Sequence, residues 1–493
     1  MRSLTYRRWA ACALLCAFAL ALNAPVYSSP PIPYKPPVGT TPDQSATPDT
    51  TAQTGSFDQI MHQSNLLGDM WGLRTALSKY GITLGLTETS ELLGNVTGGY
   101  QKGFEYDGLT VLDLQLDTNR AWHRRGGLFN ASVLQIHGNN LSASNLGSLQ
   151  TSSGITADRA TRLWELWYQQ SYSDENKLDV RIGQQSLDQE FINSSNAGIF
   201  VNTMLGWPMV PSADLPGGGP AYPLSALGVR VRDHVNDATT VLVGAFNGSP
   251  MANLDAADSQ EDNKNGLAFP LNNGVLAIAE VQFAYPGLGA MVYGDKAPLP
   301  HIYKLGAYYD STDIADTHYD SAGLSLADPA SSGSPRKHRG DYCLYGVADQ
   351  MLWVSPVDAG RNLNFFARVL GAPQEDRNTV DFAANAGLVL HDPWAHIDRD
   401  DDSVGIALGY AKVGSGISAL DRDTGRFTNS AYPVRHSETF IELTYQYAYT
   451  PWCTIQPDIQ YVFNPGGGIP NPNAAGQTVH NELVLGTRVN LIF

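Results

Sequence analysis

Several stretches of the chain carry charged side chains at every second position, between apolar ones. Asp113 and Asp117 alternate with leucines, Arg181 lies between Val180 and Ile182, and two further arginines alternate with valines, at Arg230 and Arg232. Such alternation is typical of β-strands whose two faces meet different surroundings. Arginine and carboxylate groups present hydrogen bonds in fixed geometry, so these polar faces are candidates for orienting a polar solute.

The sequence offers little that would support catalysis or metal binding. No G-x-S-x-G motif for an activated serine occurs, and the carboxylate pairs are those that any acidic chain contains. The acidic stretch 391–402 lacks the glycine and closing glutamate spacing of an EF-hand loop, so we interpret it as a solvated external loop. We therefore predict that the protein is not an enzyme and needs neither a metal nor another cofactor.

The elements that carry these residues are strands, and the clearest one closes the chain. Leu485, Val489, Leu491 and Phe493 share one face of the stretch 483–493, and Arg488 and Asn490 share the other. A final strand that ends on an aromatic residue is similar to the closing strand of bacterial outer-membrane barrels, where it serves as the assembly signal. This feature favours a barrel over a soluble sandwich.

Further strands follow the same period of two. They lie at 82–87, 112–117, 178–183, 227–232, 404–410, 441–447 and 455–463. Alternation alone does not separate a sandwich from a barrel, but aromatic residues gather at the strand ends, at Tyr410, Tyr447, Tyr449, Tyr461 and Phe463. Long polar stretches also alternate with short turns; we expect external loops at 250–266, 310–340, 371–379, 391–402 and 412–436. At roughly 25 residues per strand and connection, the chain after Gly81 makes about sixteen strands.

The N-terminal part divides into three predicted segments. Residues 1–24 fit a secretory signal peptide with three arginines before the apolar run Ala10–Leu22, with cleavage after Ala21 or Ala24, although an uncleaved anchor is the alternative. Residues 25–55 are rich in proline and predict a linker or a floppy terminus. Residues 56–80 carry apolar side chains at helical spacing and predict a short helical segment, and 81–493 form the barrel.

Composition agrees with an exported barrel. The formal net charge of −17 argues against nucleic acid as a partner. Only 16% of residues are charged, and the 48 glycines and 23 tyrosines suit strands, turns and aromatic girdles. Two cysteines remain after the signal segment, Cys343 and Cys453, which either form a disulfide in the periplasm or sit apart as small apolar residues.

Ordered motifs along the chain resemble the carbohydrate-selective porins of the OprB family. They are Trp71–Arg74, the E-x-x-x-N-x-x-G-G pattern of Glu91, Asn95 and Gly98–Gly99, the stretch Thr161–Gln170, Arg181–Gln184 with Glu190–Phe191, Phe200–Asn202 with Gly206–Pro208, and Leu215–Arg230. The resemblance implies a sixteen-stranded antiparallel barrel in the Gram-negative outer membrane that passes small sugars by diffusion. It also implies contact with outer-membrane lipid and with the assembly machinery through Phe493.

The resemblance gives the charged strands a role. A carboxylate is costly in hydrocarbon, so Trp164, Leu166 and Tyr168 should face lipid, while Glu165 and Trp167 face the lumen. We expect the pore lining to be Glu165, Trp167, Arg181, Arg230, Arg232 and Asp113, with the arginines facing the two carboxylates across a narrow zone. Trp167 is either a stacking platform or packing beneath an inward loop, and the lumen charges either bind sugar or simply solvate a wide pore.

The function predicted from the sequence is passive diffusion of glucose-like mono- and oligosaccharides into the periplasm. The alternatives are a secreted or outer-membrane sugar-binding protein and a barrel enzyme acting on carbohydrates. The sequence leaves open whether the protein is a monomer or a homotrimer.

Overall fold

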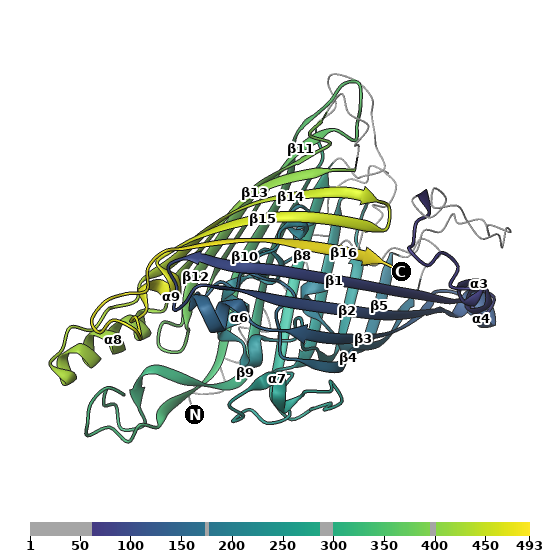
Figure 1. Ribbon diagram of the computed structural model, residues 1–493. Coiled ribbons are helices and arrows are strands. Elements are labelled where there is room, and N and C mark those ends of the chain that lie inside the picture. The colour runs from purple at the N-terminus through teal and green to yellow at the C-terminus, as the bar shows by residue number, and fades with distance from the viewer. Residues whose placement is uncertain (1–61, 173–176, 286–298, 395–400) are drawn as a thin grey trace, which may run out of the picture.

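The computed structural model describes residues 62–172, 177–285, 299–394 and 401–493 (Figure 1). The predicted signal peptide and proline-rich segment, together with the start of the predicted helical segment, lie outside these residues. In the described part, no helix is long and apolar enough to cross a membrane. The strands instead pair in one closed antiparallel ring, in which β1 meets β16.

The described residues form sixteen strands, which confirms the predicted barrel and its size. They are β1 Ile82–Thr97, β2 Gly103–Asp117, β3 Gly127–Gly138, β4 Ala160–Ser171, β5 Leu178–Gln185, β6 Ala226–His234, β7 Thr239–Asn247, β8 Val275–Tyr285, β9 His301–Asp320, β10 Pro335–Val354, β11 Asn362–Gly371, β12 Val380–His391, β13 Ser403–Val413, β14 Ser437–Thr450, β15 Cys453–Phe463 and β16 Glu482–Ile492.

Short helices occupy the connections. They are α3 Leu73–Ser78, α4 Thr118–Trp122, α5 Thr203–Gly206, α6 Met209–Asp214, α7 Ser259–Asp262, α8 Ser415–Thr428 and α9 Pro465–Gly468, with single helical turns η1 Ser142–Leu146, η2 Leu187–Gln189, η3 Asn196–Ile199 and η4 Pro216–Gly218. In Figure 1, α3, α4 and the C-terminus gather at one end of the barrel, whereas α8 and α9 lie at the opposite end.

The structure corrects two of the expected external loops, one by strand order and one by strand length. For the expected loop 391–402, β12 ends at His391 and β13 begins at Ser403, both at the end that carries the C-terminus, and residues 395–400 lie outside the described part of the chain. Most of 310–340 is strand, because β9 and β10 extend as a long hairpin. Polarity of a segment shows that it is solvated, but only the number of preceding strands decides at which end it lies.

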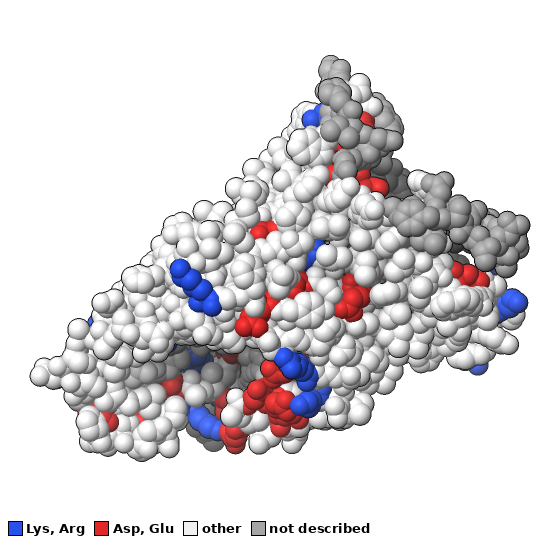
Figure 2. All heavy atoms as spheres, viewed as in Figure 1, with Lys and Arg blue, Asp and Glu red and all other residues white. Residues whose placement is uncertain are grey.

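The outer and inner faces of the wall differ in the way the alternation predicts. Outward side chains such as Leu344, Val369, Ile406, Leu443 and Ile459 are large, apolar and exposed. Figure 2 shows a wall with few charged side chains, while charged groups border a hollow near the α8 end. An apolar band facing lipid and a polar interior are the arrangement of transmembrane barrels.

The long connection from β5 to β6, residues 186–225, folds into the barrel. In Figure 1 its helical pieces around α6 lie within the ring of strands. Its apolar side chains, including Phe191, Phe200 and Met204, join one buried cluster with wall residues such as Phe366 and Phe440. The hydrophobic core therefore lies inside the barrel, between this inward segment and the wall.

The structure shows whether the two cysteines outside the signal segment form a disulfide. Cys343 and Cys453 are both buried and free, on β10 and β15. They act as small packing residues rather than as a crosslink.

Candidate functional site

Three adjacent strands carry the arginine cluster, and their register explains why it forms. Gln169 of β4 pairs with Arg181 of β5, which in turn pairs with Arg230 of β6. Asp179 and Arg232 pair with each other two residues further along. Side chains at paired positions share one face of a sheet, so all five groups point into the lumen from one part of the wall.

The cluster is held together by a carboxylate that comes from the inward segment. Glu190, directly after η2, places Oε1 2.9 Å from Nη1 of Arg181 and Oε2 2.5 Å from Nε of Arg230. Burial alone would raise the pKa of the Glu190 carboxyl, but Arg181, Arg230 and Arg232 together lower it to about 2. Glu190 is thus an ionised bridge between two arginines of like charge.

Gln169 and Asp179 accept further hydrogen bonds from the arginines of the cluster. Gln169 Oε1 accepts hydrogen bonds from Arg181 at 2.9 Å and from Arg230 at 3.0 Å. Asp179 accepts from Arg230 and, at 2.8 Å, from Nε of Arg232. Arg230 is only 1% exposed, whereas the side chains of Arg181 and Arg232 are 13% and 19% exposed. Arg230 is therefore structural, and the other two arginines are the ones that reach the lumen.

Trp167 and Glu165 support the cluster from beneath. The guanidinium of Arg181 lies 3.8 Å from the ring centroid of Trp167, a cation–π contact that covers one face of the indole. Trp167 donates its ring N–H to Oε2 of Glu165 at 3.2 Å, and Oε1 of Glu165 accepts from the backbone N–H of Ser186 at 3.0 Å. Both side chains are 7% exposed, so Trp167 is no open stacking platform and the oxygens of Glu165 are engaged within the protein.

Space for this stack depends on one glycine. Gly183 of β5 pairs with Trp167 and has a φ of +136°, a conformation that L side chains rarely adopt. A Cβ there would lie 2.3 Å from the carbonyl oxygen of Leu166 and 2.7 Å from Cα of Trp167. The glycine lets β4 and β5 approach closely where the aromatic ring is held.

The expected opposition across the pore is wrong in its geometry. Asp113 pairs with Ser132, which pairs with Glu165, so these residues form one row on β2, β3 and β4. This row and the arginines occupy neighbouring strands of the same wall and do not face one another. The carboxylate that opposes Arg181 and Arg230 is Glu190, because the inward segment brings it against the wall.

The predicted lipid-facing position of Trp164 on β4 is wrong. A register shift between Ser132 and Val133 places a bulge in β4, and Trp164 turns inward there. Its ring packs edge-on against Tyr222, with centroids 6.3 Å apart, instead of facing lipid. Leu166, 47% exposed, keeps the outward position that was predicted.

Arg368 of β11 holds the inward segment by its carbonyl groups. Its guanidinium, 1% exposed, donates to the carbonyl oxygens of Ile192, Met204, Leu205 and Gly206 at 2.7–3.1 Å. Four backbone acceptors, one between η2 and η3 and three in α5, are thereby satisfied by one planar cation. The contact fixes the segment that carries Glu190.

Carboxylates of the wall hold the same segment by its backbone N–H groups. Glu280 accepts from the N–H of Ile192 at 2.9 Å, and Glu442 accepts from those of Val201 and Asn202 at 2.6 and 3.1 Å. Wall carboxylates buried in this way act as anchors, because charge-assisted hydrogen bonds to backbone donors are strong. They are not free to contact a solute.

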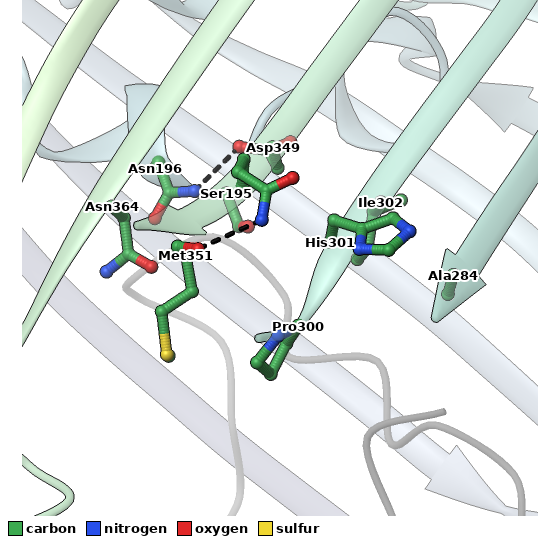
Figure 3. Close-up of a pocket in the computed structure, with 10 residues that line it drawn as sticks. Ser195, Asn196, Ala284, Pro300, His301, Ile302, Asp349, Met351 and Asn364 are labelled. Atoms are coloured by element: carbon green, nitrogen blue, oxygen red, sulfur yellow. Dashed lines mark hydrogen bonds between the residues drawn. The ribbon is translucent and has the colours of Figure 1, made fainter. Parts of the chain in front are cut away.

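A separate recess lies where η3 meets the wall (Figure 3). It encloses about 160 Å³ and is lined by residues of the inward segment and of β8 to β11. Asp349 accepts hydrogen bonds there from Ser194 at 2.5 Å and from Asn196 at 2.8 Å. No member of the arginine cluster lines this recess, so it marks another anchor of the inward segment.

Sequence reasoning missed Glu190, Asp179 and Arg368 as site residues. The alternation along β5 could have identified Asp179, because it lies two residues before Arg181 and so shares its face of the strand. Glu190 stands in a long connection whose path inside the barrel no periodicity reveals, and Arg368 looks like any other lumen charge of a strand.

Comparison with known proteins agrees with this architecture. The model of the family described as "Carbohydrate-selective porin, OprB family" matches residues 101–493. Porin B of Pseudomonas aeruginosa is 28% identical over 459 residues, covering 87% of this chain and 91% of the relative. The putative porin QuiX of Acinetobacter baylyi is 25% identical over 424 residues, covering 82% and 89%.

A solved structure shares the fold. The high-pH structure of Pseudomonas putida OprB superposes with a TM-score of 0.75 at 24% sequence identity, covering 88% of this chain and 99% of that chain. The family model spans well over half of the chain, and the closed ring of sixteen strands fits it. The chain therefore belongs to the carbohydrate-selective porins of the OprB family and is a sugar porin of the Gram-negative outer membrane.

Proposed function

We propose that this porin admits glucose-like mono- and oligosaccharides by passive diffusion past the arginine cluster. The observation that carries the proposal is the fixed guanidinium of Arg181, held by Glu190, Gln169 and Trp167 on a side chain that is 13% exposed. A preorganised donor offers hydrogen bonds to sugar hydroxyls without an ordering cost, and a few such contacts remain weak enough for release.

Within this proposal the predicted lining residues have different roles. Arg181 and Arg232 contact the sugar directly, because their side chains are the partly exposed ones among the arginines of the cluster. Arg230, Glu165 and Trp167 position them, and Asp113 contributes polarity to the wall two strands from β4. The opposition of Glu190 to the arginines provides a local transverse field at the narrow zone.

The experiment is sugar block of single channels in planar bilayers. Purified protein should give discrete conductance steps that glucose-like sugars partly block, and Arg181→Ala should weaken this block. Arg435→Ala is the matched control. Arg435 pairs with Asp421 of α8, in the connection between β13 and β14, away from the arginine cluster. Equal block in both variants would contradict the role of Arg181, and absence of steps from folded protein would contradict the channel.

Further aspects of the protein belong to the same proposal. Residues 1–24 direct export and 25–55 tether the barrel, and the closing strand with Phe493 is recognised by the assembly machinery. Liposome swelling with a panel of sugars of increasing size would define which carbohydrates pass.

A further inference from the structure

Glu482, the first residue of β16, is a buried carboxylate without a hydrogen-bond donor. It follows the connection that contains α9, and it shares the lumen face of its strand with Val484 and Arg488. The residue is 0% exposed, and within the described part of the chain neither of its carboxylate oxygens has a hydrogen-bond partner. A carboxylate in such a place is costly unless a proton or a cation neutralises it.

The charge that acts on Glu482 is that of a second buried carboxylate, Glu438 of β14. Glu438 accepts hydrogen bonds from the backbone N–H groups of Leu149, Gln150 and Gly466 at 2.8, 2.7 and 2.6 Å. These donors are neutral, so they satisfy the oxygens of Glu438 and leave its negative charge uncompensated. Two buried acids therefore lie close together at this end of the wall.

A turn in the connection between β3 and β4, residues 145–150, crosses over Glu482. At one end of this turn the carbonyl oxygen of Asn145 accepts from the backbone N–H of Tyr100 at 2.7 Å, and at the other end Glu438 holds the chain. In the ring of strands, β1, β16 and β15 lie between Tyr100 and Glu438, so the turn spans the start of β16. Burial, and after it the Glu482 carboxylate, raises the pKa of the Tyr100 hydroxyl, as expected if the two groups are neighbours.

Further oxygen atoms without a donor lie in this turn and beside it. The side-chain oxygens of Asn95, Asn145 and Ser148 have no hydrogen-bond partner among the described residues, and both asparagines are 2% exposed. Asn95 lies on β1, opposite the first residues of β16. The side chain of Asn145 lies over Gly103, the strand partner of Asn95, because a Cβ there would be 2.9 Å from its Nδ2 atom. Carboxylate, amide and hydroxyl oxygens thus gather where the turn meets the wall.

We propose that Glu482 binds a divalent cation, with Ca²⁺ as the preferred ion, together with the side-chain oxygens of Asn95, Asn145 and Ser148. Ca²⁺ takes six to eight oxygen ligands in flexible geometry and accepts carboxylates and amide carbonyls, whereas Mg²⁺ demands a regular octahedron. A bound Ca²⁺ offsets the charge of the two buried acids, which the neutral donors around Glu438 do not.

The cation would also stiffen the narrow part of the pore. Beyond the turn, Thr151 accepts from the backbone N–H of Thr203 at 3.0 Å, and Gly154 donates to the carbonyl oxygen of Val201 at 2.8 Å. Both contacts join the connection between β3 and β4 to the inward segment. A cation that ties this connection to β16 therefore holds the inward segment as well.

The test is Tb³⁺ luminescence of the full-length porin, purified in detergent and stripped of metal with EDTA. Tyr100 lies beside Glu482 and should sensitise bound Tb³⁺. We expect a saturable signal that Ca²⁺ displaces at concentrations at which Mg²⁺ has little effect. Added Ca²⁺ should also raise the temperature at which the heat-modifiable band unfolds by several degrees, because a ligand of the folded state stabilises it.

Glu482→Gln keeps the size of the side chain and removes its charge, so binding should weaken more than about tenfold. The matched control is Glu375→Gln, which removes an exposed carboxylate from the connection between β11 and β12 and should bind like the parent protein. Heat-modifiable migration in EDTA shows that each variant is folded.

The proposal fails if the parent protein binds neither ion, which is the result expected when Glu482 is held protonated. It fails equally if Glu482→Gln binds like the parent protein, or if Glu375→Gln loses binding to the same extent. Should Glu482→Gln not fold, Asn145→Asp decides, because an added carboxylate should tighten Ca²⁺ binding several-fold. Unchanged or weaker binding by a folded Asn145→Asp barrel would overturn the site.

Discussion

The guanidinium of Arg181 lies over the indole of Trp167, 3.8 Å from the ring centroid, and this contact joins β5 to β4 at the pore lining. The other side of the guanidinium is held by Glu190 of the inward segment. One arginine thus links two strands of the wall to the segment that narrows the lumen.

Replacement of Trp167 tests the value of that contact. Trp167→Leu keeps an apolar side chain but removes the cation–π interaction, which is worth about 1 kcal/mol, or roughly fivefold in an equilibrium constant. We expect sugar block of single channels to weaken by roughly that factor. The matched control is Trp353→Leu, because Trp353 lies under Arg361 at 5.9 Å on the exposed wall. Equal effects in both variants would contradict a specific role of Trp167.

The pH dependence of the cluster follows from Glu190. The pKa of Glu190 is lowered from 4.5 to about 2 in the folded protein. Its contribution to the free energy of unfolding is therefore complete above about pH 4.5 and is lost as the pH falls toward 2. Ion selectivity and sugar block that depend on Glu190 should therefore be constant from pH 8 to about 5. Reversal potentials measured across this range check the prediction.

Glu190→Gln removes the negative charge that Glu190 places beside Arg181 and Arg230. Without the carboxylate, Arg181 loses its ion-pair partner, and Asp179 alone is left to compensate Arg230 and Arg232. We expect a shift of single-channel selectivity toward anions at neutral pH, measured as a change in reversal potential under a salt gradient. Glu375→Gln, which removes a carboxylate from the connection between β11 and β12, is the control and should leave selectivity nearly unchanged.

Loss of Arg368 should loosen the inward segment. Arg368→Met leaves the carbonyl oxygens of Ile192, Met204, Leu205 and Gly206 without their donor, and each buried unsatisfied group costs about 1–3 kcal/mol. We expect lower thermal stability, larger and noisier conductance steps, and poorer discrimination by sugar size. Arg435→Met serves as control. A variant with unchanged conductance and swelling rates would show that Arg368 does not position the segment.

The close approach of β4 and β5 predicts a sharp difference between two glycines. Gly183→Ala forces a Cβ against the backbone of Leu166 and Trp167 in a left-handed conformation, so folding yield and heat resistance should fall. Gly371→Ala on β11 meets nothing within 4 Å and should fold normally. Gel migration before and after heating distinguishes the two, and equal behaviour would refute the packing argument.

Parts of the site were predictable because they depend only on period two. The lumen phase of Glu165, Trp167, Arg181, Arg230 and Arg232 follows from the cost of placing charge in hydrocarbon. Sequence phasing failed for Trp164, because a bulge inserts one residue and reverses the faces locally. It also failed for the partner of the arginines, since Glu190 reaches them through a connection without periodicity.

The sequence by itself determined the barrel. Alternating apolar and polar residues, aromatic strand ends and an apolar closing strand specify a wall with one face for lipid and one for water, and chain length sets the number of strands. Tertiary structure alone decided what the pore lining does. The inward path of residues 186–225 places Glu190 between Arg181 and Arg230, and Arg368 and the wall carboxylates hold it there. The contacts of Arg368 and Glu442 with this path join residues 164 and 241 positions apart in the chain, so periodicity along a single strand does not reveal them.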